Sequence, residues 1–266
     1  MSKDNLGDRM KHNYENRYRF SLTRRTPVII RIDGKAFHTF TRPYKKPFDY
    51  VLAKTMADTA MTLCKEIMGC QLAYVQSDEI SLLLVDYKRL ESEAWFDNNL
   101  QKMVSISASL ATLAFNTFLY KNIKAIPELI ESGWENHILK DWPTPYLKND
   151  SPALFDARAF NIPEAEVCNY FIWRQQDATR NSIESVGHVH FTNRELHKVN
   201  CNQLQEKLLR EKGVDWASFP RMFKYGVCIK KLPLMSKNKY WIIDPDTPIF
   251  TQSRKYIEEL LIPDRK

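Results

Sequence analysis

The sequence has 266 residues, of which 44% are hydrophobic, and it therefore describes a folded protein of one large or two small domains rather than a disordered chain. No apolar run approaches the roughly 20 residues that a membrane span needs, and the N-terminal segment lacks a signal-peptide core, so we expect a cytoplasmic protein without membrane association. The net charge of +7 favours polyanionic partners, although proteins that never bind nucleic acid can carry such a surplus.

A short amphipathic helix is expected at the start, because residues 1–26 carry apolar and aromatic side chains at roughly helical spacing. The following run Val-Ile-Ile-Arg-Ile, which begins at Val28, predicts a strand that is buried on both faces. An Asp-Gly dipeptide at Asp33 ends this strand. The carboxylate can bind a hard cation, while the amides of residues 34–38 and the side chain of Lys35 can bind phosphate. An aspartate that merely starts a turn would fit the same residues.

The next segment is a predicted loop that contains two prolines and three cations, Arg42, Lys45 and Lys46. Since these cations closely follow the acid, we expect the loop to lean back over a bound triphosphate. Asp49 is a plausible N-cap for a helix that continues to Gly69, because apolar residues recur every three or four positions between them. This helix is expected to pack on a sheet.

Two strands, Gln71–Val75 and Ile80–Val85, form a predicted hairpin with the acids Asp78 and Glu79 in its turn. The order strand, helix, strand, turn, strand is half of a split βαβ arrangement, in which the first strand lies beside the hairpin. Asp33 and Asp78 would then be neighbours, although they are far apart in the sequence.

A second long helix is expected from about residue 91 to residue 120, over the same face of the sheet, with Lys102 on its early turns. Its apolar side is predicted to consist of Met103, Ile106, Leu110, Leu113 and Thr117. Prolines and polar gaps then replace the helical pattern between residues 125 and 151, which makes this segment the best candidate for a domain boundary.

The second half of the chain alternates between predicted helices and short strands. A capping-box pattern, Thr192-Asn-Arg-Glu195, precedes a helix that Gly213 closes. The remaining predicted elements are a strand over Leu154–Phe160, a helix from Pro163 through Trp173 and onward to Ser185, strands over Tyr225–Lys230 and Tyr240–Ile243, and a last helix near Gln252–Leu261.

Basic residues interleaved with aromatic ones occur in four segments, at residues 11–25, 42–46, 174–180 and 224–239. This combination suits a surface that holds phosphates and stacks unpaired bases, although solvated faces would show the same pattern. The five cysteines are scattered, so we expect reduced core residues and neither disulfides nor structural zinc.

Two carboxylates at strand ends, surrounded by lysines and free amides, are what a two-metal phosphoryl or nucleotidyl transfer site requires. The motifs of a P-loop and of a Rossmann cofactor site are absent from the sequence. His188 and His190 could point to one face of a strand, but no third ligand follows them, so we interpret this pair as structural or surface residues.

Five motifs, in order along the chain, resemble those of the tRNA-histidine guanylyltransferase family of 3′-to-5′ nucleotide polymerases. The resemblance covers roughly residues 5 to 230. The motifs are Arg31-Ile-Asp-Gly-Lys-Ala-Phe-His38, Lys46-Pro47, Gln76-Ser-Asp-Glu79, Phe155-Asp-Ala-Arg158 and Trp173-Arg-Gln-Gln-Asp177.

The resemblance implies an α+β fold with a palm-like catalytic core, a ferredoxin-like split βαβ unit with an antiparallel sheet and packed helices, in residues 1–140. A helical and β extension over residues 141–266 would pack on the palm and contact tRNA. In this family the 3′-hydroxyl of an incoming nucleoside triphosphate attacks an activated 5′ end of RNA. The resemblance also implies a homo-oligomer, a tetramer built as a dimer of dimers.

The resemblance also assigns roles to individual residues. Asp33, Asp78 and the backbone carbonyl of Gly34 would hold two Mg²⁺ ions, with Glu79 supporting them. The segment Gly34, Lys35, Ala36, Phe37 and His38 would wrap the triphosphate, and Lys46 and Ser77 would serve activation of a 5′-monophosphate by ATP. The residues expected near nucleotide or RNA phosphates are Lys102, Arg31, Arg158, Arg174, Arg180 and Asn181.

One departure from the family pattern bears on the substrate. After Trp-Arg-Gln-x-Asp, the eukaryotic enzymes carry His-Ile-Asn-Asn, whereas this chain reads Thr179-Arg180-Asn181-Ser182. This difference favours the branch that repairs 5′-truncated tRNA by copying the opposite strand with ATP, GTP and other nucleoside triphosphates. The alternatives are a tRNA-histidine guanylyltransferase that adds one guanosine, a palm-type nucleotide cyclase, and an RNA-binding module in which the acids are structural.

Overall fold

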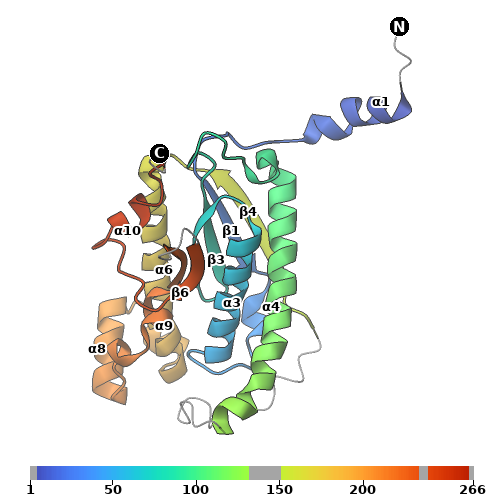
Figure 1. The fold of residues 1–266 in the computed structure, drawn as a ribbon. Coiled ribbons are helices and arrows are strands. Elements are labelled where there is room, and N and C mark those ends of the chain that lie inside the picture. The colour runs from blue at the N-terminus through green and yellow to red at the C-terminus, as the bar shows by residue number, and fades with distance from the viewer. Residues whose placement is uncertain (1–4, 132–150, 234–238, 264–266) are drawn as a thin grey trace.

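The computed structural model describes residues 5–131, 151–233 and 239–263, and its centre is a six-stranded sheet (Figure 1). The strand order is β4-β1-β3-β2-β5-β6, and every neighbouring pair is antiparallel. The strands are β1 Val28–Gly34, β2 Cys70–Gln76, β3 Glu79–Leu84, β4 Phe155–Asn161, β5 Val227–Pro233 and β6 Lys239–Asp244.

The first four strands and two long helices form the predicted split βαβ unit. The chain runs β1, α3 (Tyr50–Glu66), β2, β3, α4 (Leu100–Glu131), β4, and the strands lie in the order β4-β1-β3-β2. Both helices cover the same face of the sheet (Figure 1). Asp49 caps α3, since its carboxylate accepts a hydrogen bond from the amide of Leu52. The α+β, ferredoxin-like fold class is therefore confirmed.

Strand β1 is buried on both faces, as its apolar run predicted. Ile30 and Ile32 pack into the core beneath α3 and α4, whereas Ile29 packs into a second core on the opposite face. All three are fully buried. Because burying an isoleucine side chain contributes about 1.5–3 kcal/mol, this central strand is among the most strongly stabilised elements of the fold.

The opposite face of the sheet is covered by α6 (Glu164–His190), with α10 (Lys255–Glu258) beside it (Figure 1). The predicted helix ended at Ser185, but α6 runs on through His190. The prediction that His188 and His190 could lie on a strand is therefore wrong. They occupy the last turn of α6, where the helix dipole favours cations.

Helix α4 differs from its prediction in start and orientation. It begins at Leu100, not near residue 91, because a 3₁₀ turn, η2 (Trp95–Asn98), with left-handed residues precedes it. Of the predicted apolar side, Met103 is buried, but Leu113 is 68% exposed. The buried side instead includes Ser107 and Ala111, which carry too little hydrophobic signal to mark it in the sequence.

The expectation that no apolar run reaches membrane-spanning length is also corrected. Within α4, the segment Leu100–Ile126 contains an 18-residue window with a mean hydropathy of 1.4, and it is long enough, by length and composition, to cross a membrane. In this fold α4 packs on α3 and β4. Phe115 and Leu119 of α4 lie in the hydrophobic core between the two helices and the sheet. The core helix of a globular domain shows the same composition, so this finding is weak support for a span.

Several smaller elements lie near their predicted positions, whereas the short helices at Phe37–Phe40 and Arg221–Tyr225 were not predicted. The capping box at Thr192 and Glu195 is present, but the helix predicted from it is two helices, because Asn200 and Gln203 form a second capping box. All five cysteines are free. The remaining helices and 3₁₀ turns are α1 Leu6–Asn13, η1 Glu15–Tyr18, α2 Phe37–Phe40, α7 Asn193–Leu196, α8 Cys201–Lys212, η4 Trp216–Ser218 and α9 Arg221–Tyr225.

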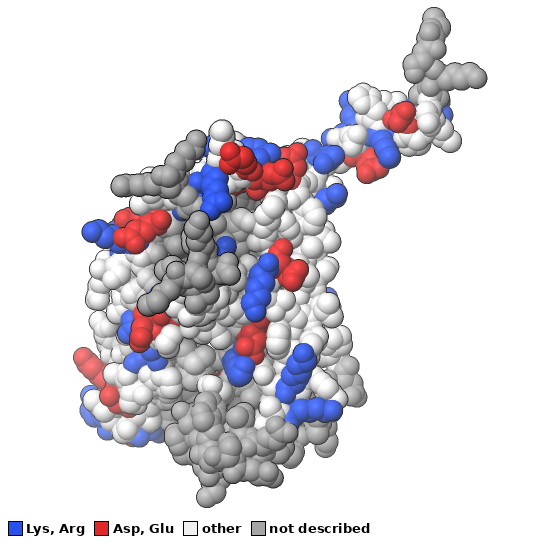
Figure 2. All heavy atoms as spheres, in the orientation of Figure 1, with Lys and Arg blue, Asp and Glu red and all other residues white. Residues whose placement is uncertain are grey.

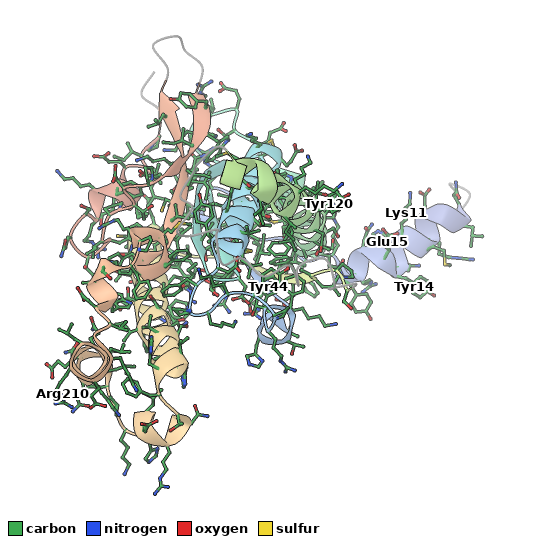
Figure 3. The ribbon with its side chains drawn as sticks, turned by 90° about the horizontal axis from the view of Figure 1, so that it is seen from below. Lys11, Tyr14, Glu15, Tyr44, Tyr120 and Arg210 are labelled. Atoms are coloured by element: carbon green, nitrogen blue, oxygen red, sulfur yellow. The ribbon has the colours of Figure 1, made fainter. Side chains whose placement is uncertain are left out.

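The division at residue 140 falls outside the described residues and stays a prediction. The sheet nevertheless extends across it, since β4 pairs along β1, and β5 pairs with β2. The strands of the second half thus complete the sheet of the first half. In contrast, α1 and η1 bury no residue and stand away from the body as an N-terminal arm (Figures 1 and 3).

Candidate active site

The acids of β1 and of the β2–β3 hairpin meet at one end of the sheet. Asp33 pairs with Glu79 in the β1–β3 register, and the amide of Gly34 donates to the carbonyl of Asp78 at 3.2 Å. Ser77, in the left-handed conformation with φ of 48°, forms the hairpin turn and donates its hydroxyl to the Asp78 carboxylate at 3.0 Å. The structure therefore brings Asp33, Asp78 and Glu79 together, as the split βαβ topology predicted.

Close packing makes glycine necessary at position 34. A Cβ atom there would lie 2.1 Å from the ring of Phe37, which is far inside van der Waals contact. Phe37 is buried and its ring contacts those of Phe115 and Phe155, with centroids 5.4 and 5.3 Å apart. The turn behind Asp33 is thus held against the core, which keeps the carboxylate in place.

Burial raises the pKa of the Asp33 carboxyl, and the carboxylates of Glu79 and Asp156 raise it further, while Arg158 and Arg31 partly offset them. Burial also raises the pKa of Asp78, against the hydrogen bond from Ser77 and with a smaller contribution from Asp33. Both carboxylates are therefore held in an environment that opposes their negative charge.

Asp33 and Asp78 are suited to a divalent cation. Among the described residues, neither forms an ion pair with lysine or arginine, and no cluster of three or more metal-ligating side chains occurs. Mg²⁺ is commonly bound by one or two carboxylates, with water and phosphate oxygens completing its shell. Two such carboxylates and the nearby carbonyl of Gly34 fit this pattern.

Glu79, in contrast, is already neutralised. Arg174 of α6 donates to both of its oxygens at 2.7 and 2.8 Å, and Gln76 and Ser81 donate to Oε1 at 3.3 and 3.4 Å. The Nε atom of Arg31 lies 4.0 Å from Oε2. Glu79 is thus a fixed acid that positions the end of the hairpin.

Arg174 is buried, and its side chain is 7% exposed. Its Nη2 atom also contacts Asp177 at 3.0 Å. Burial acts to lower the pKa of this guanidinium, but Glu79 and Asp177 outweigh it and raise the pKa. A direct RNA contact by Arg174 stays a prediction, whereas its contact with Glu79 gives it a positioning role.

A cavity of about 410 Å³ opens beside the acids, within the size range of small-molecule sites. Its walls come from the loop before α3, from α3, from the hairpin, from α6 and from α9. They combine carboxylates and lysines with apolar surface, as a site for a phosphorylated nucleotide requires. Its polar lining includes Asp33, Asp78, Lys45, Lys46, Asp177 and Asn181.

Only some of the backbone amides in the predicted phosphate-binding segment, residues 34–38, are available to bind a phosphate. The amide of Gly34 is bonded to Asp78, and the amide of Lys35 donates to the carbonyl of Leu154 at 2.8 Å, so neither is available as predicted. The amides of Phe37 and His38 lie in the first turn of α2, which has no preceding helical carbonyl. Triphosphate binding by residues 34–38 stays a prediction that rests on this second part and on the exposed Lys35.

The other predicted cations lie at different distances from the acids. Arg158 stands opposite Arg31 in the β1–β4 pairing, close enough to affect Asp33, whereas exposed Arg180 pairs with Asp177. Lys102 is not brought to the site. It lies on the first turn of α4, and the part of that helix beside Phe37 is Phe115, roughly 20 Å further along.

Two features of the site were missed in the sequence. One is the α6 side that faces the cavity, where Asp177 and Ser185, which were not predicted as site residues, form one helical stripe with the predicted Arg174 and Asn181. The other is a stacked pair of rings from Phe48 and Phe223, 4.8 Å apart, which no local pattern links.

The comparisons with known proteins identify the family of this chain. The family model described as tRNAHis guanylyltransferase matches residues 7–163. A bacterial tRNA(His) guanylyltransferase-like protein, solved in complex with ATP, superposes with a TM-score of 0.80 and 42% identity over 97% of this chain and 99% of that one. A complex with GTP matches at a TM-score of 0.73 and 39% identity over the same shares. The tRNA(His) guanylyltransferase of Debaryomyces hansenii is 28% identical over 77% of this chain and 73% of its own length.

Proposed function

Because the chain belongs to the tRNAHis guanylyltransferase family and is therefore a nucleotidyltransferase, we propose that it repairs 5′-truncated tRNA by adding nucleotides in the 3′-to-5′ direction. The observation that carries this proposal is the pair of unneutralised carboxylates, Asp33 and Asp78, at the edge of a nucleotide-sized cavity with lysines. The residues Thr179–Ser182 favour repair over the addition of a single guanosine.

The reaction would join the 3′-hydroxyl oxygen of an incoming nucleoside triphosphate to the α-phosphorus of an activated RNA 5′ end. The bond to the AMP or pyrophosphate leaving group breaks in the same displacement. Asp33, Asp78 and the carbonyl of Gly34 would hold two Mg²⁺ ions, whose chemistry is to stabilise the attacking and leaving oxygens. The fixed Glu79–Arg174 pair keeps the hairpin acid from shifting, and the cavity orients the nucleotide.

ATP and GTP are proposed as substrates of this chain, since the relatives solved with them share its fold over 97% of its length. If the protein were instead a nucleotide cyclase, pyrophosphate would be released without RNA. RNA-dependent release from ATP or GTP is the expected result. Release at the same rate with and without tRNA would favour the cyclase.

Copying of the opposite strand is tested with tRNAs that lack their first nucleotides. A tRNA whose first missing position lies opposite C should receive G, and one opposite A should receive U, with addition stopping when the acceptor stem is complete. The matching nucleotide should be preferred by roughly 5- to 150-fold, because a well-placed base contact contributes about 1–3 kcal/mol of discrimination. The measurement is single-turnover extension of a labelled tRNA with each nucleotide separately.

The result that contradicts repair is equally clear. If guanosine were added opposite A as readily as opposite C, and only to tRNA-histidine, the chain would be a dedicated guanylyltransferase. A full-length tRNA with a complete stem is the control, and it should receive nothing.

Lys46 is proposed to act in activation of a 5′-monophosphate, since it lines the cavity on the loop that precedes α3. We expect Lys46→Ala to slow addition to 5′-monophosphorylated RNA at least roughly tenfold, whereas 5′-triphosphorylated RNA, which already carries a leaving group, should react at nearly the wild-type rate. Arg42→Ala is the matched control, because Arg42 lies on the same loop outside the cavity lining. Equal losses on both substrates would make Lys46 a general phosphate contact.

We propose a homo-oligomer, with the tetramer of the family resemblance as its form. The N-terminal arm and the segment that follows it expose five large apolar or aromatic side chains, and α4 exposes three at seven-residue spacing, a repeat typical of helices that pack together. Figure 3 shows Tyr14 of the arm and Tyr120 of α4 on the same side of the molecule. The exposed residues are Leu6, Met10, Tyr14 and Tyr18 on the arm, Phe20 just after it, and Ile106, Leu113 and Tyr120 on α4.

Light scattering checks the oligomer. The mass should be a multiple of the 31.3 kDa chain, and Leu113→Glu should reduce it because a charge would enter the apolar interface. A wild-type mass of one chain would rule out the oligomer.

A cytoplasmic location without membrane association is proposed as well, and fractionation of cells that express the protein tests it.

A further inference from the structure

The edge strand β4 presents a row of exposed side chains on the face that α6 covers only in part. Asp156, Arg158 and Phe160 alternate with buried or half-buried residues, and they pair with Asp33, Arg31 and Ile29 of β1. Phe160 therefore lies four residues from the level of Asp33, or roughly 13 Å along the strand. This row leads directly from the acids toward the opposite end of the sheet.

Three aromatic rings join the end of this row to α6. The ring of Phe160 meets that of Tyr170 at 6.0 Å, and Tyr170 meets Trp173 at 5.9 Å, both edge to face. Tyr170 is buried, and its hydroxyl shares a hydrogen bond of 2.8 Å with Ser81 of β3. Phe160 and Trp173, however, are 36% and 50% exposed. We refer to Phe160, Tyr170 and Trp173 as the aromatic platform.

The platform is held rigidly and is tied to the acid site. The guanidinium carbon of Arg174 lies 4.4 Å from the ring centroid of Trp173, as in a cation–π contact. Arg174 is itself fixed by its two hydrogen bonds to Glu79. The indole thus has a cation stacked on it and half of its surface open to solvent. Little side-chain entropy remains to be lost when a flat ligand stacks there.

An exposed arginine, Arg158, lies near the aromatic platform. Arg158 lies between the platform and the acids, 52% exposed, and its contact with Asp156 at 3.4 Å is an exposed ion pair, which contributes little and can be exchanged for a phosphate. On the face made by α3 and α4, in contrast, Figure 2 shows most of the basic side chains next to acidic ones. An isolated exposed ring needs no explanation, but fixed rings beside arginine are how proteins hold single-stranded nucleic acid.

We propose that the aromatic platform stacks an unpaired base of the tRNA 3′ strand while Arg158 contacts its phosphate, an inference that rests on the proposed function. A tRNA that lacks 5′ nucleotides has unpaired bases opposite the gap and beyond it. When the templating base lies at the acids, a stacked strand at about 3.4 Å per nucleotide reaches the platform within roughly four nucleotides. Stacking on the platform then replaces the stacking that these bases lose when the 5′ nucleotides that pair with them are missing.

The test is equilibrium binding, without nucleotides or Mg²⁺, of two fluorescent acceptor-stem hairpins. One carries a four-nucleotide unpaired 3′ extension and the other is blunt. Trp173→Ala should weaken binding of the extended hairpin roughly tenfold and leave the blunt one unchanged, and Trp173→Phe should restore most of the affinity. Replacing the extension with abasic nucleotides should cause a similar loss in the wild type and no further loss in Trp173→Ala.

Tyr240→Ala is the matched control, because Tyr240 is a 46% exposed aromatic residue on β6, at the opposite edge of the sheet. It should bind both hairpins as the wild type does. Unchanged binding by Trp173→Ala, or an equal loss for extended and blunt hairpins, would overturn the platform. Because this assay needs no catalysis, it separates the two proposals: a platform effect in a protein that adds no nucleotides would reject only the repair function.

Discussion

Replacing either Asp33 or Asp78 with asparagine is expected to lower the rate of nucleotide addition by at least ~10³-fold. Each change removes one of the two carboxylates that would hold Mg²⁺, and sites of this kind depend mostly on electrostatic stabilisation of the reacting oxygens. The measurement is single-turnover extension of a truncated, 5′-triphosphorylated tRNA, so that the activation step does not enter the rate. Asp156→Asn, which changes an exposed acid of the neighbouring strand, is the control and should remain active.

The same variants should not lose stability. Because the pKa of both carboxyls is raised in the folded state, their ionised forms oppose folding at pH 7, and this cost disappears as the pH falls toward the ordinary value of 3.8. Without Mg²⁺, Asp33→Asn and Asp78→Asn should therefore melt at or above the wild-type temperature at pH 7, with a smaller difference near pH 4.

Mg²⁺ gives a readout that does not depend on activity. It should raise the melting temperature of the wild type, since a ligand that binds only the folded state stabilises it, and it should have little effect on either variant. Wild-type activity in Asp33→Asn or Asp78→Asn, or equal Mg²⁺ shifts in all proteins, would contradict the assignment of these acids as metal ligands.

Replacing Arg174 with alanine is expected to have the largest effect on stability. The change would leave Glu79 buried without its two charge-assisted hydrogen bonds, and removing one partner of a buried ion pair typically costs about 3–5 kcal/mol. For a chain of this size that corresponds to a fall in melting temperature of about 10 °C. Urea unfolding of Arg174→Ala measures the loss in free energy directly.

Two further variants separate positioning from RNA contact. Arg174→Lys keeps the charge but not the paired geometry, so it should recover only part of the stability. Glu79→Gln combined with Arg174→Ala removes the unpaired charge and should be more stable than Arg174→Ala alone. Arg210→Ala, which removes an exposed arginine with a surface partner, should change nothing. Wild-type stability in Arg174→Ala, with weakened RNA binding, would show that Arg174 acts as an RNA contact instead.

The sequence determined by itself the elements whose signals are local. The β-branched run before Asp33, the N-cap at Asp49 and the acidic turn at Asp78 each depend on residues that are close together in the sequence, and all three are confirmed. Their order predicted the split βαβ unit, and right-handed crossover topology then placed the two acids together. The motifs in the same segments indicated the family. The α6 stripe that starts at Arg174 was also readable, although it was not read.

Only the tertiary structure decided which surfaces and hydrogen-bonding groups remain available. Weak signals from Ser107 and Ala111 concealed part of the buried side of α4, so the predicted side was wrong at Ile106 and Leu113, which are exposed. The amide of Lys35, predicted to be free, bonds to Leu154, and Arg174 of α6 meets Glu79 of β3. Local periodicity describes which side chains share a face. It does not specify which distant face they meet, because the competition among long-range partners is settled by packing the whole chain at once.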